Sequence, residues 1–249
     1  RLDAMLHALT GRAFGEAPAK QPRGAVGLRP SSKVIPLETK PTRGWTLSSA
    51  RQAVTYECVG GRKSSSSDAV IYTVKGPYGK DYIAKVFVGD ARMQNRDREA
   101  RVYAALGASR AGGDTIDPAA ASLCCELMDV VEVDCGDHKG CPALILEKGR
   151  KSLQEVIDNR ALVEEAGDLV TLGKQVLGGI AHLHSKGLIW TDAKPANFVN
   201  FFNEQTDKID RKMVDFNTAV CEGDRVTAAT DEHAPPEYHA EEPPLADES

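Results

Sequence analysis

Short β-rich runs follow one another through the first half of the sequence, and they limit the folds that are open to it. Three of them, AVTYECV (53–59), AVIYTV (69–74) and DYIAKVFV (81–88), are rich in β-branched and aromatic residues. The loop GGRKSSSSD separates the first two, and KGPYGK, with Gly and Pro at a turn, joins the last two. The pattern predicts three successive antiparallel strands.

A predicted helix and two more β-rich runs extend this part of the chain. The segment ARMQNRDREARVYAALGA (91–108) carries apolar residues along one side and predicts a helix. After it, ELMDVVEVD (126–134) and PALILEKG (142–149) predict two strands around the polar turn CGDHKGC. Residues 52–149 are therefore expected to form five antiparallel strands with one inserted helix.

The periodicity becomes helical after residue 150. SLQEVIDNRAL (152–162) predicts a short helix, and GDLVTLGKQVLGGIAHLHSKG (167–187) a longer one with apolar residues at steps of three and four. The short strands LIW, NFVNFF and KMVDF follow, joined by polar loops. The predicted fold class is α+β, with a mainly helical part at 150–240 and an acidic tail at 241–249.

The first 51 residues differ from the rest in composition. Prolines recur there too often for a helix, so residues 1–51 are predicted to form an extended arm. Residues 1–50 carry a net charge of +5 and the remainder a net charge of −10. The acidity of the whole chain argues against a protein that coats nucleic acid. The basic arm is the segment through which we expect a protein substrate or a protein assembly to dock.

The length of the apolar runs and the spacing of the cysteines indicate the cellular environment of the protein. No run approaches the roughly 18 apolar residues that a membrane span needs, so none is expected. The six cysteines include no C-x-x-C pair and are typical of reduced thiols. We therefore expect a soluble, intracellular protein, either in the cytoplasm or in an organelle such as a plastid, since the start of the chain is rich in Arg, Ser and Pro and poor in acid.

The most informative segment is LHSKGLIWTDAKPANFV (183–199). It places Asp192 after a short strand, Lys194 two residues later and Asn197 five residues after the Asp. Downstream, the strand KMVDFN ends on Asp215. Upstream, the run IAKVF carries a strand lysine, and DREARVYAAL carries a helical glutamate. Taken alone, each of these segments could be a turn, a strand end or a surface charge. Their order along the chain argues against a chance occurrence of the whole set.

In this order the segments resemble the eukaryotic protein-kinase superfamily, over residues 52 to 240. The matching patterns are H-R-D-x-x-x-x-N, D-F-G, and the V-A-I-K strand with its helix Glu. The resemblance implies a two-lobed protein-kinase-like fold, with a five-stranded antiparallel N-lobe and a mainly helical, incomplete C-lobe. It also implies transfer of the γ-phosphate of ATP to a protein hydroxyl with Mg²⁺ as cofactor. Lys194 favours the Ser/Thr subgroup.

The resemblance assigns a role to each site residue. Those nearest the reacting phosphate are the catalytic Asp192 and Lys194 and the metal-binding Asn197 and Asp215. A strand lysine paired with a helix glutamate would hold the α- and β-phosphates, here Lys85 and Glu99. The adenine would be contacted by Val70, Ala84, Leu146, Glu147 and Gly149.

The sequence also departs from the family pattern. The glycines of the phosphate loop are replaced by Lys63, Ser65 and Asp68, although Gly60 and Gly61 lie just before them. Trp190 and Thr191 stand in place of His-Arg, and we expect Trp190 to pack beneath Phe216. TDEHAPPEY (230–238) resembles the A-P-E segment, but few residues follow it. These departures keep open an alternative, a kinase-fold scaffold or pseudokinase subunit of a larger assembly with weak or no catalysis.

Overall fold

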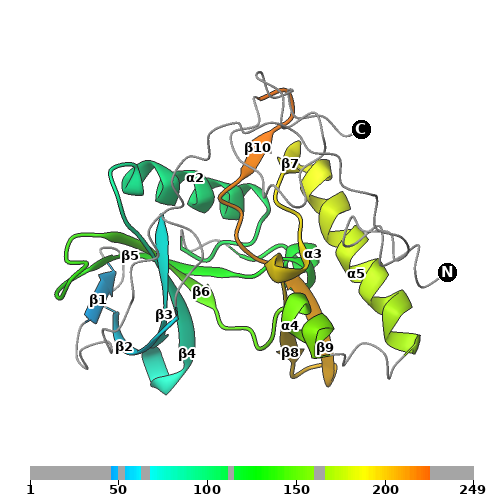
Figure 1. Cartoon of the computed structure of the whole chain (residues 1–249), viewed down its shortest axis with the longest axis horizontal. Coiled ribbons are helices and arrows are strands. Elements are labelled where there is room, and N and C mark those ends of the chain that lie inside the picture. Colours follow the sequence, from blue (N-terminus) through cyan, green and yellow to red (C-terminus); the bar gives the residue numbers. More distant parts are fainter. Residues whose placement is uncertain (1–45, 50–53, 63–67, 112–114, 160–165, 225–249) are drawn as a thin grey trace, which may run out of the picture.

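Six strands close into an antiparallel barrel in the order β1-β2-β3-β4-β6-β5 (Figure 1). This computed structural model describes residues 46–49, 54–62, 68–111, 115–159 and 166–224. The barrel strands are β1 (Thr46–Ser49), β2 (Thr55–Arg62), β3 (Ala69–Lys75), β4 (Asp81–Phe87), β5 (Leu127–Val133) and β6 (Pro142–Glu147). A 3₁₀ turn, η1 (Pro77–Gly79), joins β3 to β4.

Side chains alternate between the two faces of each strand, so the barrel residues divide into an inner and an outer set. The inner set is mostly apolar and fills the barrel, with the buried Asp129 accepting a hydrogen bond from the Tyr56 hydroxyl. We call it the inner cluster: Leu47, Tyr56, Cys58, Tyr72, Val74, Tyr82, Ala84, Val86, Val131, Val133, Ala143 and Ile145. The outer faces of β4 and β6 pack against helix α2 (Arg92–Ala105). The buried outer residues join those of the second half of the chain in one core, which we call the outer cluster.

The second half is built around helix α5 (Ala166–Ser185), which packs on two small sheets. One pairs β8 (Phe198–Asn203) with β9 (Lys208–Met213), and the other pairs β7 (Leu188–Trp190) with β10 (Ala219–Cys221). A Cβ on Gly179 would lie 3.0 Å from Met213 Sδ, so the glycine lets α5 approach β9 closely. The remaining elements are α3 (Pro118–Leu123), α4 (Leu153–Asp158) and the 3₁₀ turn η3 (Pro195–Asn197).

The predicted fold class is wrong. Instead of a two-lobed protein-kinase-like fold with a five-stranded N-lobe and a mainly helical C-lobe, the structure is mostly a closed six-stranded barrel, with four α-helices among the described residues. The sixth strand is β1, from residues assigned to the arm, and it pairs with both β2 and β5. Closure depends on the pairing of β1 with β5, which joins segments distant in sequence and which the local pattern does not reveal. The second half likewise has four strands beside its helices.

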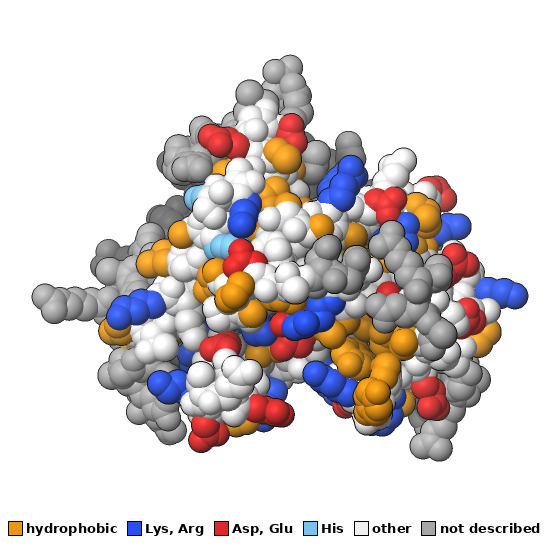
Figure 2. Space-filling model, turned by 180° about the vertical axis from the view of Figure 1, so that it is seen from behind, with side chains coloured by type: hydrophobic (Ala, Val, Ile, Leu, Met, Phe, Trp, Pro, Cys, Tyr) orange, Lys and Arg blue, Asp and Glu red, His pale blue; other side chains and the backbone are white. Residues whose placement is uncertain are grey.

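Other expectations are met at the level of single elements. The five strands predicted between residues 52 and 149 are all present, as is the helix at 91–108. No helix among the described residues is long and apolar enough to cross a membrane. Among the large exposed apolar side chains of the described residues, Val170 and Leu177 share helix α5 and the other four lie on four other elements. Figure 2 shows charged groups of both signs interspersed over one face of the molecule. The arm up to residue 45 and the tail at 241–249 lie outside the described residues.

Candidate functional site

A buried lysine joins two carboxylates on the outer side of the barrel. Lys85 lies on the outer face of β4 and is 4% exposed, and Glu99 of α2 is fully buried opposite it. Lys85 Nζ lies 2.6 Å from Glu99 Oε2 and 2.7 Å from Asp215 Oδ1. The Asp215 side chain follows β9 and is about one third exposed, at 36%. One ammonium group thus links the barrel, α2 and the second half of the chain.

Burial sets the protonation equilibria of this pair. Loss of hydration is the largest effect on Glu99 and raises its pKa to about 7, although Lys85 acts in the opposite direction. Burial alone would lower the pKa of Lys85, but the carboxylates of Glu99 and Asp215 more than offset it, and the pKa is raised. The lysine therefore stays charged at neutral pH, while Glu99 titrates within the physiological range.

A second group of polar side chains follows β7. Asp192 is 7% exposed, and its Oδ2 accepts a hydrogen bond from Asn197 Nδ2 (3.1 Å) and lies 2.7 Å from Lys194 Nζ. Asn197 Nδ2 also donates to the Asp192 carbonyl oxygen, over 2.9 Å. Pro195 begins the 3₁₀ turn η3, which carries Asn197 back toward the aspartate. This turn explains how residues five apart in sequence meet.

Two hydrogen bonds hold the second group against Asp215. The Val214 N–H donates to the Asn197 carbonyl (2.9 Å), and Trp190 Nε1 donates to the Asp215 carbonyl (3.2 Å). Asp215 has φ of +64°, a left-handed conformation that costs a residue with a side chain about 1 kcal/mol or more. The indole hydrogen bond from Trp190 helps to maintain this conformation.

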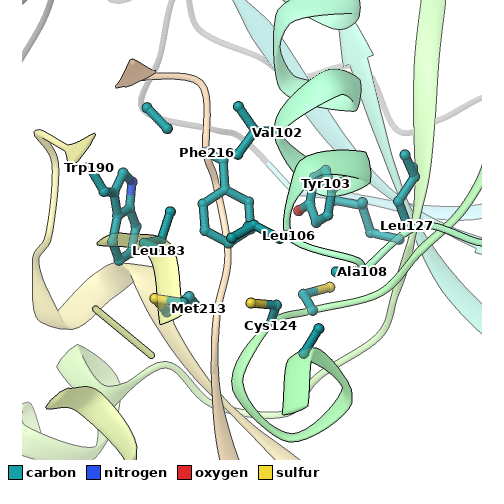
Figure 3. Packing of buried hydrophobic residues seen from close by; sticks show 14 of the residues in the cluster. Val102, Tyr103, Leu106, Ala108, Cys124, Leu127, Leu183, Trp190, Met213 and Phe216 are labelled. Carbon is teal, nitrogen blue, oxygen red and sulfur yellow. The ribbon is translucent and has the colours of Figure 1, made fainter. Parts of the chain in front are cut away.

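The aromatic side chains next to Asp215 pack as the sequence predicted. The rings of Trp190 and Phe216 lie 5.6 Å apart between centroids, which confirms the expected contact. Phe216 also meets Tyr103 of α2 edge to face, at 5.1 Å. Figure 3 shows Phe216 between the other two rings, above Met213. The backbone at Asp215 is thereby anchored to the core.

The residues predicted around the adenine are divided between the two faces of the barrel wall. Ala84 and Val70 belong to the inner face, because Ala84 lies in the inner cluster and Val70 packs against it. The structure therefore does not bring them to Lys85. The residues that share the outer face with Lys85 include Ile71, directly opposite it, and Ile83, two residues before it and opposite Leu146. Strand alternation counted from Lys85 is the signal that identifies them.

The connection from β6 to the second half begins at Glu147. The Glu147 N–H donates to the Glu126 carbonyl (3.0 Å), and Cys125 Sγ lies 3.5 Å from the Glu147 carbonyl oxygen, so this backbone is engaged within the barrel. A Cβ on Gly149 would lie 2.9 Å from Phe201 Cζ and would also collide with Val199. Only glycine lets the chain pass this close to β8.

Some expected site features lie outside the described residues. They are the serine-rich loop at 63–67 and the segment TDEHAPPEY at 230–238. Within the described part of the chain, no three His, Cys, Asp or Glu side chains are grouped so that they could hold a metal. The sequence matches no protein-family model and no curated protein.

Proposed function

We propose that this chain is an ATP-dependent phosphotransferase with the chemistry of the protein Ser/Thr kinases, acting on a protein hydroxyl. The observation that carries the proposal is the double contact of the buried Lys85 with Glu99 and Asp215. Such a lysine supplies fixed positive charge for phosphates. Asp192, Lys194 and Asn197 supply a carboxylate, a second lysine and an amide, the groups that phosphoryl transfer requires, and Asn197 is hydrogen-bonded to Val214, the residue before Asp215.

Asp192 is the proposed base. Its carboxylate would accept the proton of the substrate hydroxyl as the hydroxyl oxygen bonds to the γ-phosphorus. The bond from that phosphorus to the bridging oxygen breaks, and ADP leaves. Lys194 would balance the negative charge that the phosphoryl oxygens carry during transfer. The contacts of Lys194 and Asn197 with one Asp192 oxygen, at 2.7 and 3.1 Å, fix the orientation of the carboxylate.

The donor set fits Mg²⁺ bound together with a nucleotide. This cation takes oxygen ligands and is usually held by one or two protein groups and substrate phosphates, so a cluster of three carboxylates is not required. The partly exposed Asp215 carboxylate and the Asn197 amide oxygen are the proposed ligands. When bound, the cation would neutralise charge on the phosphates.

A second candidate function is that of a scaffold or pseudokinase subunit that holds nucleotide weakly and does not turn it over. The position of Gly60 and Gly61 favours it. Both lie in β2 and pair with Thr73 and Tyr72 of β3, and a Cβ on Gly60 would meet nothing within 4 Å. Gly60 therefore serves no close backbone approach among the described residues.

Transfer of labelled γ-phosphate from Mg-ATP to a mixed protein substrate or to the chain itself separates the two candidates. We expect Asp192→Asn to lower the rate at least about 100-fold, as for the loss of a positioned base. Asp90→Asn, an exposed change of the same kind in the turn before α2, should leave the rate unchanged. Equal rates in wild type and Asp192→Asn would refute the phosphotransferase proposal.

A further inference from the structure

A second buried lysine lies outside the group described above. Lys212 of β9 has a side chain that is only 8% exposed, and its Nζ lies 2.8 Å from Glu147 Oε2. The same Nζ lies 4.9 Å from the centroid of the Phe201 ring. Lysine is among the residues least often fully buried, and a buried ammonium group needs a carboxylate or an aromatic face to offset its lost hydration. Lys212 has both.

These two contacts hold the two ends of one short segment. Glu147 is the last residue of β6, and its Oε2 also lies 3.4 Å from the Glu126 N–H. Phe201 packs against the backbone of Gly149, where a Cβ would lie 2.9 Å from its ring. Lys212 therefore holds Glu147 directly and Gly149 through Phe201. The three residues 147–149 are the covalent link by which the barrel passes into the second half of the chain.

We propose that Lys212 is a positioning residue for the nucleotide, because it fixes the path of residues 147–149. This inference rests on the proposed function and on the implication of the kinase resemblance that Glu147 and Gly149 contact the adenine. Leu146, which faces Ile83 on the outer wall, immediately precedes it. A segment fixed before the nucleotide arrives loses less conformational freedom on binding, so affinity depends on the restraint.

The charge of Lys212, rather than its bulk, is the essential feature. Lys212→Met keeps a long apolar side chain against Phe201 but removes the partner of Glu147. Lys212→Arg keeps the charge. Glu147→Gln removes the charge from the other end, at a side chain that is 25% exposed. Lys186→Met is the control, since it breaks an ion pair of 3.6 Å with Asp117, whose side chains are 35% and 36% exposed and which involves no residue of 147–149.

The test has two arms, both on the full chain. The first measures hydrogen exchange, without nucleotide, of the main-chain amides of Glu147 and Arg150, which donate to the Glu126 and Asn200 carbonyls. We expect exchange at least about tenfold faster in Lys212→Met and in Glu147→Gln, with Lys212→Arg and Lys186→Met close to wild type. The second measures steady-state kinetics with Mg-ATP. We expect KM for ATP to rise at least about fivefold in Lys212→Met while kcat stays within about twofold, since binding and not chemistry is weakened.

The outcomes separate the two proposals. Unchanged exchange in both Lys212→Met and Glu147→Gln overturns the positioning role, whether or not the protein uses ATP. Faster exchange with an unchanged KM, or an equal response in Lys186→Met, also overturns it. A wild-type protein that neither binds nor turns over ATP overturns the proposed function and with it the link to nucleotide, while the exchange arm still reports on the segment. If Lys212→Met does not fold, Glu147→Gln decides.

Discussion

Replacing Glu99 by Gln tests whether burial or the ion pair with Lys85 dominates at the centre of the site. Glu99 is fully buried, and its carboxylate lies 2.6 Å from the Lys85 ammonium. Burial favours the protonated acid, whereas the lysine favours the carboxylate. In this structure burial has the larger effect and raises the pKa of Glu99 from 4.5 to about 7. Glutamine keeps the size of the side chain and removes the titration.

The sign of the effect follows from linkage. The folded state binds the Glu99 proton more tightly than the unfolded state, so the stabilisation is complete below pH 4.5 and is lost as the pH rises to 7. With 1.36 kcal/mol per pKa unit, the loss is on the order of 3 kcal/mol. Lys85 remains protonated over this whole range because its pKa is raised, so it adds no slope.

The measurement is urea unfolding, followed by circular dichroism, at several pH values between 4.5 and 8. The difference in free energy of unfolding between wild type and Glu99→Gln cancels the titration of groups that do not interact with Glu99. We expect the wild type to lose about 3 kcal/mol relative to the variant across this interval. Glu57→Gln, an exposed change of the same kind on β2, serves as control. A difference that grows in favour of wild type with rising pH would show that the ion pair outweighs burial.

Two further substitutions test single contacts. Trp190→Phe keeps an aromatic ring against Phe216 but removes the hydrogen bond to the Asp215 carbonyl. We therefore expect the free energy of unfolding to fall by about 1 kcal/mol and kcat to fall about fivefold. Unchanged kinetics would show that the indole N–H does not position Asp215. Gly149→Ala places a methyl group against Val199 and Phe201, so we expect the free energy of unfolding, measured by thermal unfolding, to fall by about 1–3 kcal/mol. Gly60→Ala, with open space at its Cβ, should change it little. Equal thermal midpoints for the two variants would contradict the packing described at β8.

The sequence predicted single elements better than their arrangement. The strand around Lys85 and the helix around Glu99 follow from local periodicity, and both form. Strand β1 was missed because its four residues TLSS include one apolar side chain, and it is held by pairing with β2 and β5. Barrel closure is a property of the distant β1–β5 pairing, and a pattern along the chain carries no record of it.

In the candidate site, too, contacts between residues close in sequence could be predicted and contacts between distant residues could not. Residues close in sequence, such as Asp192, Lys194 and Asn197, could be proposed together because a short turn is the natural way to join them. Ala84 was chosen by likeness to a motif, although strand alternation places Ile83 on the face of Lys85. Lys212 has no sequence signal at all, since its partner Glu147 is 65 residues away and a lone lysine in a strand is usually solvated.

The most direct test of the account is magnesium-linked ATP binding. The thermal midpoint of the wild type and of Asp215→Asn is measured with ATP in excess magnesium and with ATP in EDTA. A nucleotide at 100 times its Kd stabilises a folded protein by about 2.7 kcal/mol, which gives a readily measured shift. We predict a large shift for wild type only when magnesium is present, and equal, small shifts for Asp215→Asn in both conditions. A wild-type midpoint that ATP leaves unmoved, or a magnesium effect that survives in Asp215→Asn, would contradict the account.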